Sequence, residues 1–265
     1  MNSLMIDVES HFKSIHTKMI YQIGWVFGNA RDRKAPRKER EFFVKEFLPL
    51  NYWKHSFIDK DKNSRTFGKR LFWKMDSRGD AVHRHILAHP HKIKSWNEIM
   101  EILTLDCSMV DAIGSYNWGF DSSAIDDTNR TLNHQAIIDT LDSKKFFCLL
   151  DCYVNKVINR NYFIFIDGLD EGEIENYKSK SGKNLGYSAE IMARYMMQHH
   201  DYIESHLALE DARIEFELLE HFLARYNKDF KTEFLGNPKY VSWTKIRDRH
   251  TATKKIEARK LLSIW

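Results

Sequence analysis

Three strand-like segments follow one another within the first fifty residues, and they constrain the fold more than any other feature. Residues 4–10 (LMIDVES), 19–29 (MIYQIGWVFGN) and 40–48 (REFFVKEFL) are rich in β-branched and aromatic residues, which favour strands. The connection at 31–40 (RDRKAPRKER) carries six Arg and Lys side chains and a proline, which suits a charged hairpin loop. We therefore expect three neighbouring antiparallel strands.

The remainder of the chain alternates helical patterns with short strands. Apolar residues recur at three- and four-residue spacing in 67–75, 80–90, 95–110, 188–197 and 207–226, which predicts helices there. We expect a short strand at 111–117, a helix in the later part of 118–134, and a strand running into a helix at 146–158. Residues 161–185 have the composition of an irregular insertion. Strands followed by alternating helices and strands predict a mixed α/β sheet.

Composition bounds the class of protein without choosing a function. The chain has 265 residues, of which 43% are hydrophobic and 29% charged, as expected of a soluble globular protein. It contains no stretch typical of a membrane span or a secretory signal, so we expect a cytoplasmic protein. Cys107, Cys148 and Cys152 lack the spacing of a disulfide framework or a zinc knuckle. The net charge of +4 suits a nucleic-acid partner but also many other proteins.

Asp7 and Glu9 lie in the middle of the first strand-like segment, where an ordinary buried strand carries no charge. Residues two apart in a strand point to the same face, so the two carboxylates share one small site. Like charges a few ångströms apart repel each other, and a bound divalent cation is the usual compensation. An edge strand with one solvated face is the alternative, and the segment alone does not separate the two.

Two later segments carry side chains that would suit the same site. Asp121 follows the strand at 111–117, and α/β proteins tend to place their chemistry at strand ends. His206 precedes Asp211 by five residues, and a continuous helix would place them about 140° apart. The two can face one site only if His206 lies on the loop before the helix.

Together, IDVES, YNWGFD and HLALEDA resemble, in this order, the three exonuclease motifs of the DnaQ-like DEDDh family of 3′–5′ exonucleases. The matching residues are Asp7 and Glu9 in the first motif, Asn117, Phe120 and Asp121 in the second, and His206 and Asp211 in the third. The related DEDDy pattern would place a tyrosine four residues before the last aspartate, where this chain has Leu207. The histidine pattern therefore fits better.

The resemblance implies an RNase H-like fold for residues 1–226, with three antiparallel strands plus parallel strands flanked by helices, followed by a basic extension at 227–265. It also implies two Mg²⁺ or Mn²⁺ ions held by Asp7, Glu9, Asp121 and Asp211, with Asp7 bridging both. His206 would be the general base, since an imidazole accepts a proton near neutral pH. Hard cations take oxygen ligands, which agrees with a site made of carboxylates.

The expected substrate is the 3′ end of single-stranded DNA, with single-stranded RNA as the alternative. Asn117 and Phe120 of the second motif are expected to contact it. The basic loop could hold the nucleic-acid backbone through Arg33, Lys34, Arg37 and Lys38, or could be a solvated hairpin tip. A second alternative is an accessory subunit whose tail at 227–265 docks onto a polymerase or another protein. The sequence does not indicate an oligomeric state.

Several other features give weaker signals. We expect at most one of Phe12, Trp25 and Trp118 to stack on a base. His85 and His89 are four residues apart, a spacing that can bind zinc, but no third ligand is evident.

Three further features are not expected to take part in the chemistry. His199 and His200 lack the spacing of His206 from Asp211, and we expect them to be exposed. The segment KSKSGKN lacks the first glycine of a P-loop. Asp151 stands where these exonucleases often carry an aspartate, and we assign it no catalytic role.

Overall fold

A six-stranded mixed sheet forms the centre of the protein, with strand order β6-β3-β2-β1-β7-β8. The computed structural model of the chain describes residues 1–14, 17–48, 56–58, 70–72, 84–133, 144–178, 185–198, 200 and 202–239. The strands of this sheet are β1 (Asn2–Ser14), β2 (Thr17–Asn29), β3 (Lys38–Val44), β6 (Ile93–Lys94), β7 (Ala112–Ser115) and β8 (Lys145–Cys148). A separate antiparallel pair consists of β4 (Ser56–Ile58) and β5 (Arg70–Phe72).

The pairing confirms the predicted fold class. β1, β2 and β3 form two consecutive antiparallel pairs joined by hairpins, and the charged segment predicted between the second and third strands is the β2–β3 connection. β7 pairs in parallel with β1, β8 pairs in parallel with β7, and β6 pairs in parallel with β3. Three antiparallel strands extended by parallel strands and flanked by helices give an α/β, RNase H-like arrangement.

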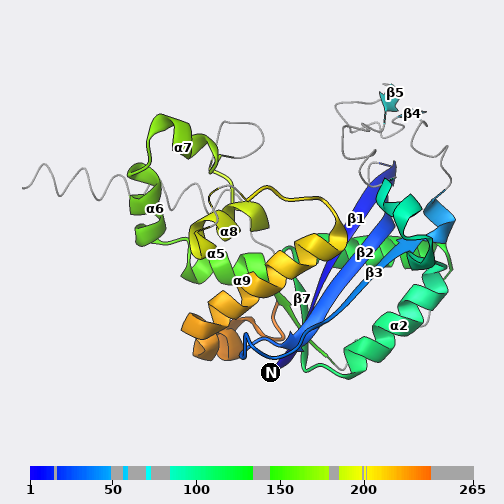
Figure 1. The fold of residues 1–265 in the computed structure, drawn as a ribbon, viewed down its shortest axis with the longest axis horizontal. Coiled ribbons are helices and arrows are strands. Elements are labelled where there is room, and N and C mark those ends of the chain that lie inside the picture. Colours follow the sequence, from blue (N-terminus) through cyan, green and yellow to red (C-terminus); the bar gives the residue numbers. More distant parts are fainter. Residues whose placement is uncertain are drawn as a thin grey trace, which may run out of the picture.

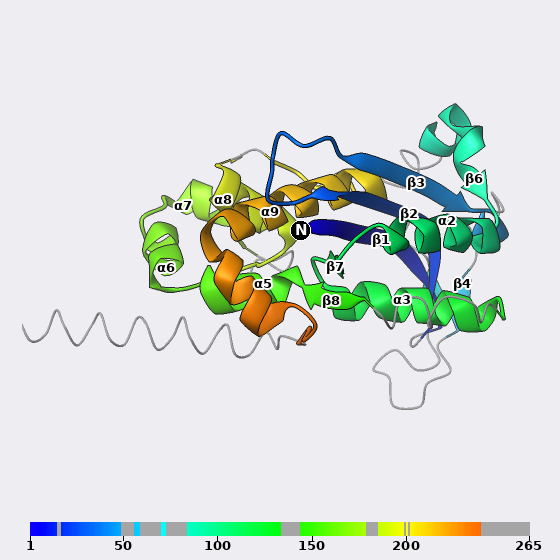
Figure 2. The same ribbon diagram turned by 90° about the horizontal axis from the view of Figure 1, so that it is seen from below.

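Helices cover both faces of the sheet (Figures 1 and 2). One face carries α2 (Trp96–Ser108) and α3 (Trp118–Thr131). The other carries α5 (Leu149–Lys156), α8 (Ala189–Met197) and the long α9 (Ala208–Asp229), with α6 (Arg160–Asp167) and α7 (Glu171–Glu175) beyond them. Short 3₁₀ turns η1 (Lys45–Phe47) and η3 (Pro90–Lys92) flank β3 and β6, and a π-helical turn, η4 (Phe230–Phe234), follows α9. No helix in the described part of the chain has both the length and the apolar composition needed to cross a bilayer.

Strand β1 separates two hydrophobic cores by its alternation. Leu4, Ile6 and Val8 point into the core beneath α2 and α3. Met5 points into the core beneath α5, α8 and α9. Because side chains alternate along a strand, the carboxylates of Asp7 and Glu9 follow Met5 on the α9 face. Asp7 and Glu9 thus lie on the same face of β1 as the buried Met5, at the point where the apolar packing ends.

Gly24 allows α9 to begin directly against the sheet. It pairs with Asp7 in the β1–β2 register. A Cβ atom at position 24 would overlap the backbone nitrogen of Leu209 and would lie 2.5 Å from the carbonyl carbon of Ala208. Because only glycine permits this approach, the first turn of α9, which contains Asp211, lies close above the strand that neighbours Asp7.

Two sequence predictions of local structure are wrong. Residues 70–72, within a segment predicted to be helical, form β5, because they find a pairing partner in β4 that periodicity cannot reveal. Residues 161–185 were predicted to be irregular, yet most of the described part belongs to α6 and α7. Asp170 and Glu173 start α7 as a capping box, in which each side chain accepts a hydrogen bond from the other's backbone N–H.

The chain after residue 226 continues into the domain before it reaches the expected extension. α9 extends to Asp229, and both Phe230 and Phe234 of η4 are buried in the α9-side core. Gly236 then donates its backbone N–H to the carbonyl of Phe146 on β8. The basic residues from 240 onward lie outside the described part.

We predict that Gly24→Ala destabilises the protein by at least about 2 kcal/mol, since the added methyl must push α9 away from the sheet. Thermal or urea unfolding would measure this loss. Gly172→Ala is the matched control, because a Cβ at position 172 meets no atom closer than 3.4 Å and α7 gains helix propensity. Equal stability of Gly24→Ala and the wild type would show that α9 does not depend on this contact.

Candidate active site

The residues of the three sequence motifs meet at one place on the α9 face of the sheet. Asp7 and Glu9 come from β1, Asp121 from the first turn of α3, and Asp211 from the first turn of α9. Asp7 and Glu9 share one face of β1, Asp121 hydrogen-bonds to the backbone of Val8 between them, and carboxylate oxygens of Glu9 and Asp211 lie within 4.8 Å of each other. The structure therefore brings together carboxylates that lie up to about two hundred residues apart in the sequence.

Asp121 reaches the site because β7 is much shorter than β1. β7 pairs with β1 only at Ser3, Leu4 and Met5, whereas β1 continues to Ser14. The edge of β1 beyond Met5 is therefore available to the turn that follows β7. Asp121 uses it by accepting a hydrogen bond from the backbone N–H of Val8.

His206 lies on the loop before α9, as the spacing from Asp211 required. Its backbone is left-handed, with φ of 55°, which is uncommon for a residue other than glycine. Its Nδ1 atom lies 3.6 Å from Glu204 Oε2 and 3.9 Å from Glu9 Oε1. A strained conformation of this kind is often kept where a side chain must be aimed at a functional site.

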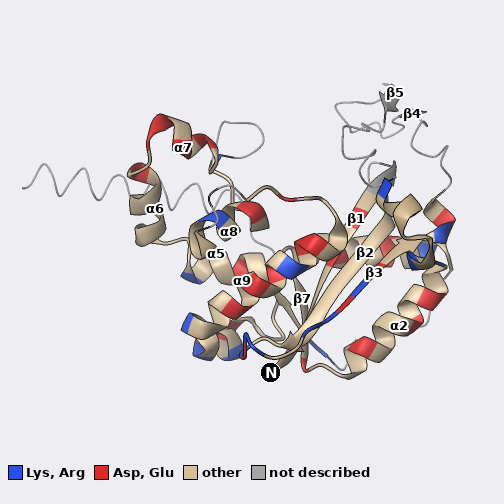
Figure 3. Cartoon of the chain, viewed as in Figure 1, with Lys and Arg blue, Asp and Glu red and all other residues tan. Residues whose placement is uncertain are grey.

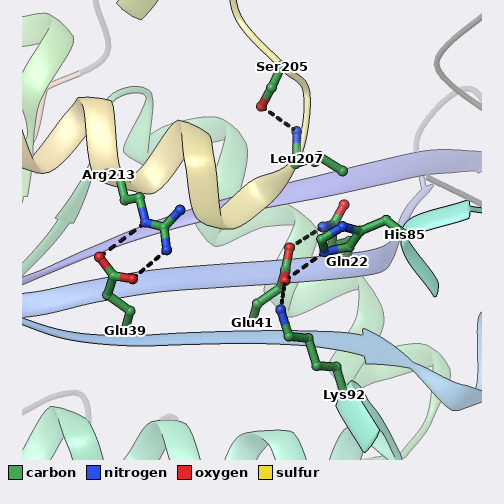
Figure 4. Close-up of polar contacts among 8 residues, drawn as sticks. All are labelled: Gln22, Glu39, Glu41, His85, Lys92, Ser205, Leu207 and Arg213. Carbon is green, nitrogen blue, oxygen red and sulfur yellow. Dashed lines mark hydrogen bonds and ion pairs between the residues drawn. The ribbon is translucent and has the colours of Figure 1, made fainter. Parts of the chain in front are cut away.

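Ser205 connects this loop to the helix. Its hydroxyl donates to Asp211 Oδ1 at 3.4 Å and accepts the backbone N–H of Leu207 at 3.2 Å, the second contact being drawn in Figure 4. Potential ligand atoms of Glu9, His206 and Asp211 all lie within 4.8 Å of one another. This spacing would allow a single cation to contact all three.

Burial and mutual repulsion raise the pKa values of the central carboxyls. For Asp7, burial is the main cause of the raised pKa, followed by repulsion from Glu215, Asp121, Glu9 and Asp211. Burial raises the pKa of Asp121 to about 7, although the Ser115 hydroxyl and the Lys18 ammonium oppose the shift. Burial, with Glu204 and Glu9 nearby, raises the pKa of Asp211 to about 8. Ionising all of these groups near neutral pH therefore calls for added positive charge.

Three residues that the sequence reading missed also belong to this environment. Glu215, one turn after Asp211, is buried, and burial together with Asp121 raises its pKa. Glu204 lies beside His206. The i, i+4 spacing of Asp211 and Glu215 on a helix with an apolar stripe was the available signal for the first, because it places both on one face.

Tyr21, the third missed residue, is placed by a β-bulge. The register moves from Glu9 opposite Gln22 to Ser10 opposite Ile20, which leaves Tyr21 as the extra residue of β2. The Tyr21 hydroxyl donates to Glu9 Oε2 at 3.3 Å. The bulge therefore supplies a donor that helps to hold Glu9, and sequence alone does not show a bulge.

Asn117 and Phe120, the other residues of the second motif, lie next to Asp121. Asn117 is the exposed N-cap residue of α3. Phe120 is half-buried, and Lys18 Nζ lies 3.9 Å from the centre of its ring while donating to Ser123 Oγ at 2.6 Å. These positions border the carboxylates, but their predicted contact with a substrate remains a prediction.

The basic loop lies at the other end of the sheet, beside the N-terminus (Figure 3). Arg37 contacts α9, where its guanidinium lies 2.7 Å from Glu220 Oε2 and 5.1 Å from the Phe216 ring. Glu220 is nine residues beyond Asp211 on α9, about 14 Å along the helix. The structure therefore does not bring Arg37 to the carboxylates.

The neighbouring loop residues have separate surroundings. Arg33 acts electrostatically on Glu220, Lys34 is exposed, and Lys38 Nζ lies 5.7 Å from the Phe27 ring. None of these contacts is with the carboxylates that face Asp7. A role of this loop in binding nucleic acid remains a prediction.

Among the aromatic candidates, Trp25 is fully buried on the opposite face of β2, where its Nε1 donates to Asp106 at 2.9 Å. It therefore cannot stack on a substrate at the α9 face. Trp118 stacks on Phe146 with ring centres 4.8 Å apart. The side chain of Phe12 lies outside the described part.

The histidine pair at 85 and 89 belongs to a different arrangement. His85 Nε2 lies 2.9 Å from Glu41 Oε2, a buried carboxylate that also accepts from Lys92 and Gln22 (Figure 4). The rings of His85 and His89 lie 4.7 Å apart, but no third ligand joins them in the described part of the chain.

The remaining positions singled out from the sequence are His199, His200 and Asp151. His200 is exposed, with Nδ1 lying 3.3 Å from the Tyr177 hydroxyl, while His199 lies outside the described residues. Asp151 is buried in the first turn of α5, where its Oδ1 accepts from Asn155 at 2.7 Å.

Comparison with models of known protein families finds no match for this chain, and comparison with curated protein sequences finds none either.

The raised pKa values predict how stability depends on pH without metal. Aspartate titrates near about 3.9 in an unfolded chain, whereas the pKa values of Asp121 and Asp211 are about 7 and about 8 in the folded one. Because the folded state binds these protons more tightly, these groups make the free energy of unfolding fall as pH rises from about 4 to about 8. A divalent cation that binds the ionised carboxylates should reverse this loss.

Thermal unfolding in chelator and in Mg²⁺ tests this pH dependence. The metal-induced rise in Tm should be larger near pH 8 than near pH 5, since more of the carboxylates are ionised at the higher pH. In Asp211→Asn, the metal-induced rise in Tm should differ less between the two pH values. An equal rise at both pH values in the wild type would contradict a cation bound by these carboxylates.

Proposed function

We propose that this protein is a metal-dependent 3′–5′ exonuclease that hydrolyses the 3′ end of single-stranded nucleic acid, with DNA preferred, and that it is a DnaQ-like enzyme of the DEDDh type. The observation that carries the proposal is the meeting of Asp7, Glu9, Asp121 and Asp211 around one place, with His206 on the adjoining loop. The order and internal spacing of the three motifs support an exonuclease. The release of nucleoside 5′-monophosphates follows from this activity.

The donor atoms fit hard divalent cations. Asp7 Oδ2 is a buried oxygen without a hydrogen-bond partner among the described residues, so it is available as a metal ligand. Asp7, Glu9 and Asp211 would hold one Mg²⁺ or Mn²⁺ ion, and Asp7 and Asp121 a second. Such ions supply an activated water and neutralise charge on the phosphate and the leaving oxygen.

His206 has the chemistry of the general base in this proposal. Its imidazole takes the proton from the attacking water, and the nearby Glu204 carboxylate stabilises the imidazolium that results. The hydrogen bond from Ser205 to Asp211 and the left-handed backbone at His206 hold the loop against the start of α9. The 20% exposure of the His206 side chain leaves it in contact with solvent, from which the water comes.

Substrate contacts are assigned to the residues that border Asp121. Asn117 is exposed at the start of α3, and the Phe120 ring offers an aromatic surface beside Lys18. A terminal nucleotide bound there would place its phosphate near the carboxylates. The basic loop could contact only nucleotides farther from the 3′ end of the nucleic acid, because Arg37 pairs with α9 far from Asp211.

Degradation of 5′-labelled oligonucleotides tests the proposal. With Mg²⁺, single-stranded DNA should give a ladder shortening from the 3′ end, and chelator should abolish it. Asp7→Asn should remove turnover and retain the fold, whereas Asp111→Asn should behave as the wild type, because Asp111 precedes β7 and contacts Asn2 at the far end of β1. Faster degradation of RNA would favour the exoribonuclease alternative, and cleavage by metal-free protein would refute the proposal.

His206→Ala should lower the rate by about 10²–10⁴-fold, the usual contribution of a general base, while metal and single strands still bind. The acidic limb of the pH–rate profile should disappear in this variant. His200→Ala is the control, because His200 is exposed and contacts Tyr177. A normal rate and pH profile in His206→Ala would remove the assignment, and loss of metal binding would make His206 a ligand.

A further inference from the structure

The turn between β7 and α3 is fixed through Tyr116, whose polar groups each contact a different element. Its backbone N–H donates to Glu215 Oε2 on α9 at 3.0 Å. Its carbonyl accepts the N–H of Leu150 on α5 at 2.8 Å, and its hydroxyl donates to the carbonyl of Tyr187 before α8 at 2.6 Å. Because Tyr116 is buried, water cannot replace these contacts.

Glu215 is the member of this junction that links it to the carboxylates. It lies one turn after Asp211 on α9, so the two side chains share one face of the helix. It is 4% exposed, and its neighbours include Asp121, Asp211 and Asp7. An acid placed among other buried acids adds repulsion, so a compensating role is expected of it.

The contact of Glu215 with Tyr116 connects the β7–α3 turn to α9. Tyr116 immediately precedes Asn117, the N-cap of α3, and Asp121 follows in the first turn of that helix. Asp211 lies on α9, four residues before Glu215. The hydrogen bond therefore sets the position of the start of α3, which carries Asp121, relative to the start of α9, which carries Asp211.

We infer that Glu215 is a positioning residue of the proposed nuclease: by accepting the backbone N–H of Tyr116, it holds Asn117 and Asp121 at the correct distance from Asp211. This inference rests on the proposed function. An apolar residue at position 215 would leave the buried N–H of Tyr116 without its acceptor. A glutamine would keep an acceptor oxygen at the same place.

The test compares Glu215→Ala with Glu215→Gln. Loss of the acceptor in Glu215→Ala should lower kcat on single-stranded DNA by about 10²-fold with little change in KM, as expected of a misplaced reacting group. Glu215→Gln should keep most of the turnover. Amide hydrogen exchange at Tyr116 should accelerate strongly in the alanine variant and stay slow in the glutamine variant.

Glu220→Ala is the matched control, since Glu220 is also a buried carboxylate on α9 but pairs with Arg37. It should lower stability while leaving kcat and Mn²⁺ affinity as in the wild type. Equal loss of turnover in Glu215→Gln and Glu215→Ala would overturn the inference, because the negative charge itself would then be required. Normal turnover in Glu215→Ala would overturn it as well.

The same variants separate this inference from the proposed function. If the wild type degrades neither DNA nor RNA, the proposed function fails, and exchange at the Tyr116 amide and Mn²⁺ affinity still decide the role of Glu215. Weaker Mn²⁺ binding and faster exchange in the alanine variant, both restored in the glutamine variant, would support the positioning role. Unchanged exchange in Glu215→Ala would overturn it.

Discussion

The burial of several carboxylates close to one another is the constraint on which the rest of this structure depends. Asp7, Asp121, Asp211 and Glu215 all have raised pKa values, mainly because they are buried, and neighbouring carboxylates raise the pKa further at Asp7, Asp211 and Glu215. Without compensation, such a cluster of carboxylates destabilises the folded state, so the surrounding elements must keep these side chains in place. Gly24 lets α9 begin against β2, and the early end of β7 lets Asp121 reach the edge of β1.

The sequence predicts the fold best where the signal is local. The three N-terminal strands and α9 follow from composition and periodicity, because each is a long element with one buried face. β5 was not predicted because its pairing partner, β4, lies in a separate segment of the sequence. α6 and α7 escaped because short helices in a Gly-, Lys- and Glu-rich stretch depend on caps such as Asp170, which leave little periodicity to detect.

The candidate site was accessible from the sequence to the extent that its residues recur at fixed short spacings. The Asp-x-Glu pair indicated two carboxylates on one face of β1, and the spacing of His206 from Asp211 indicated a loop position for His206, which the structure brings close to Glu9 and Asp211. Glu215 was missed because its meaning depends on Tyr116, about a hundred residues away. The aromatic candidate Trp25 faces the other core, and the partner of Arg37 is Glu220, because the folded chain decides which neighbours they meet.

The central claim is that these carboxylates are gathered to bind divalent cations. Diffraction from crystals grown with Mn²⁺ tests it most directly, because the anomalous signal of manganese marks each bound ion independently of the protein density. The account predicts anomalous peaks in contact with the carboxylates of Asp7, Glu9 and Asp211, and loss of these peaks in Asp7→Asn. Carboxylates that keep their positions in Mn²⁺ without any anomalous peak between them would contradict it.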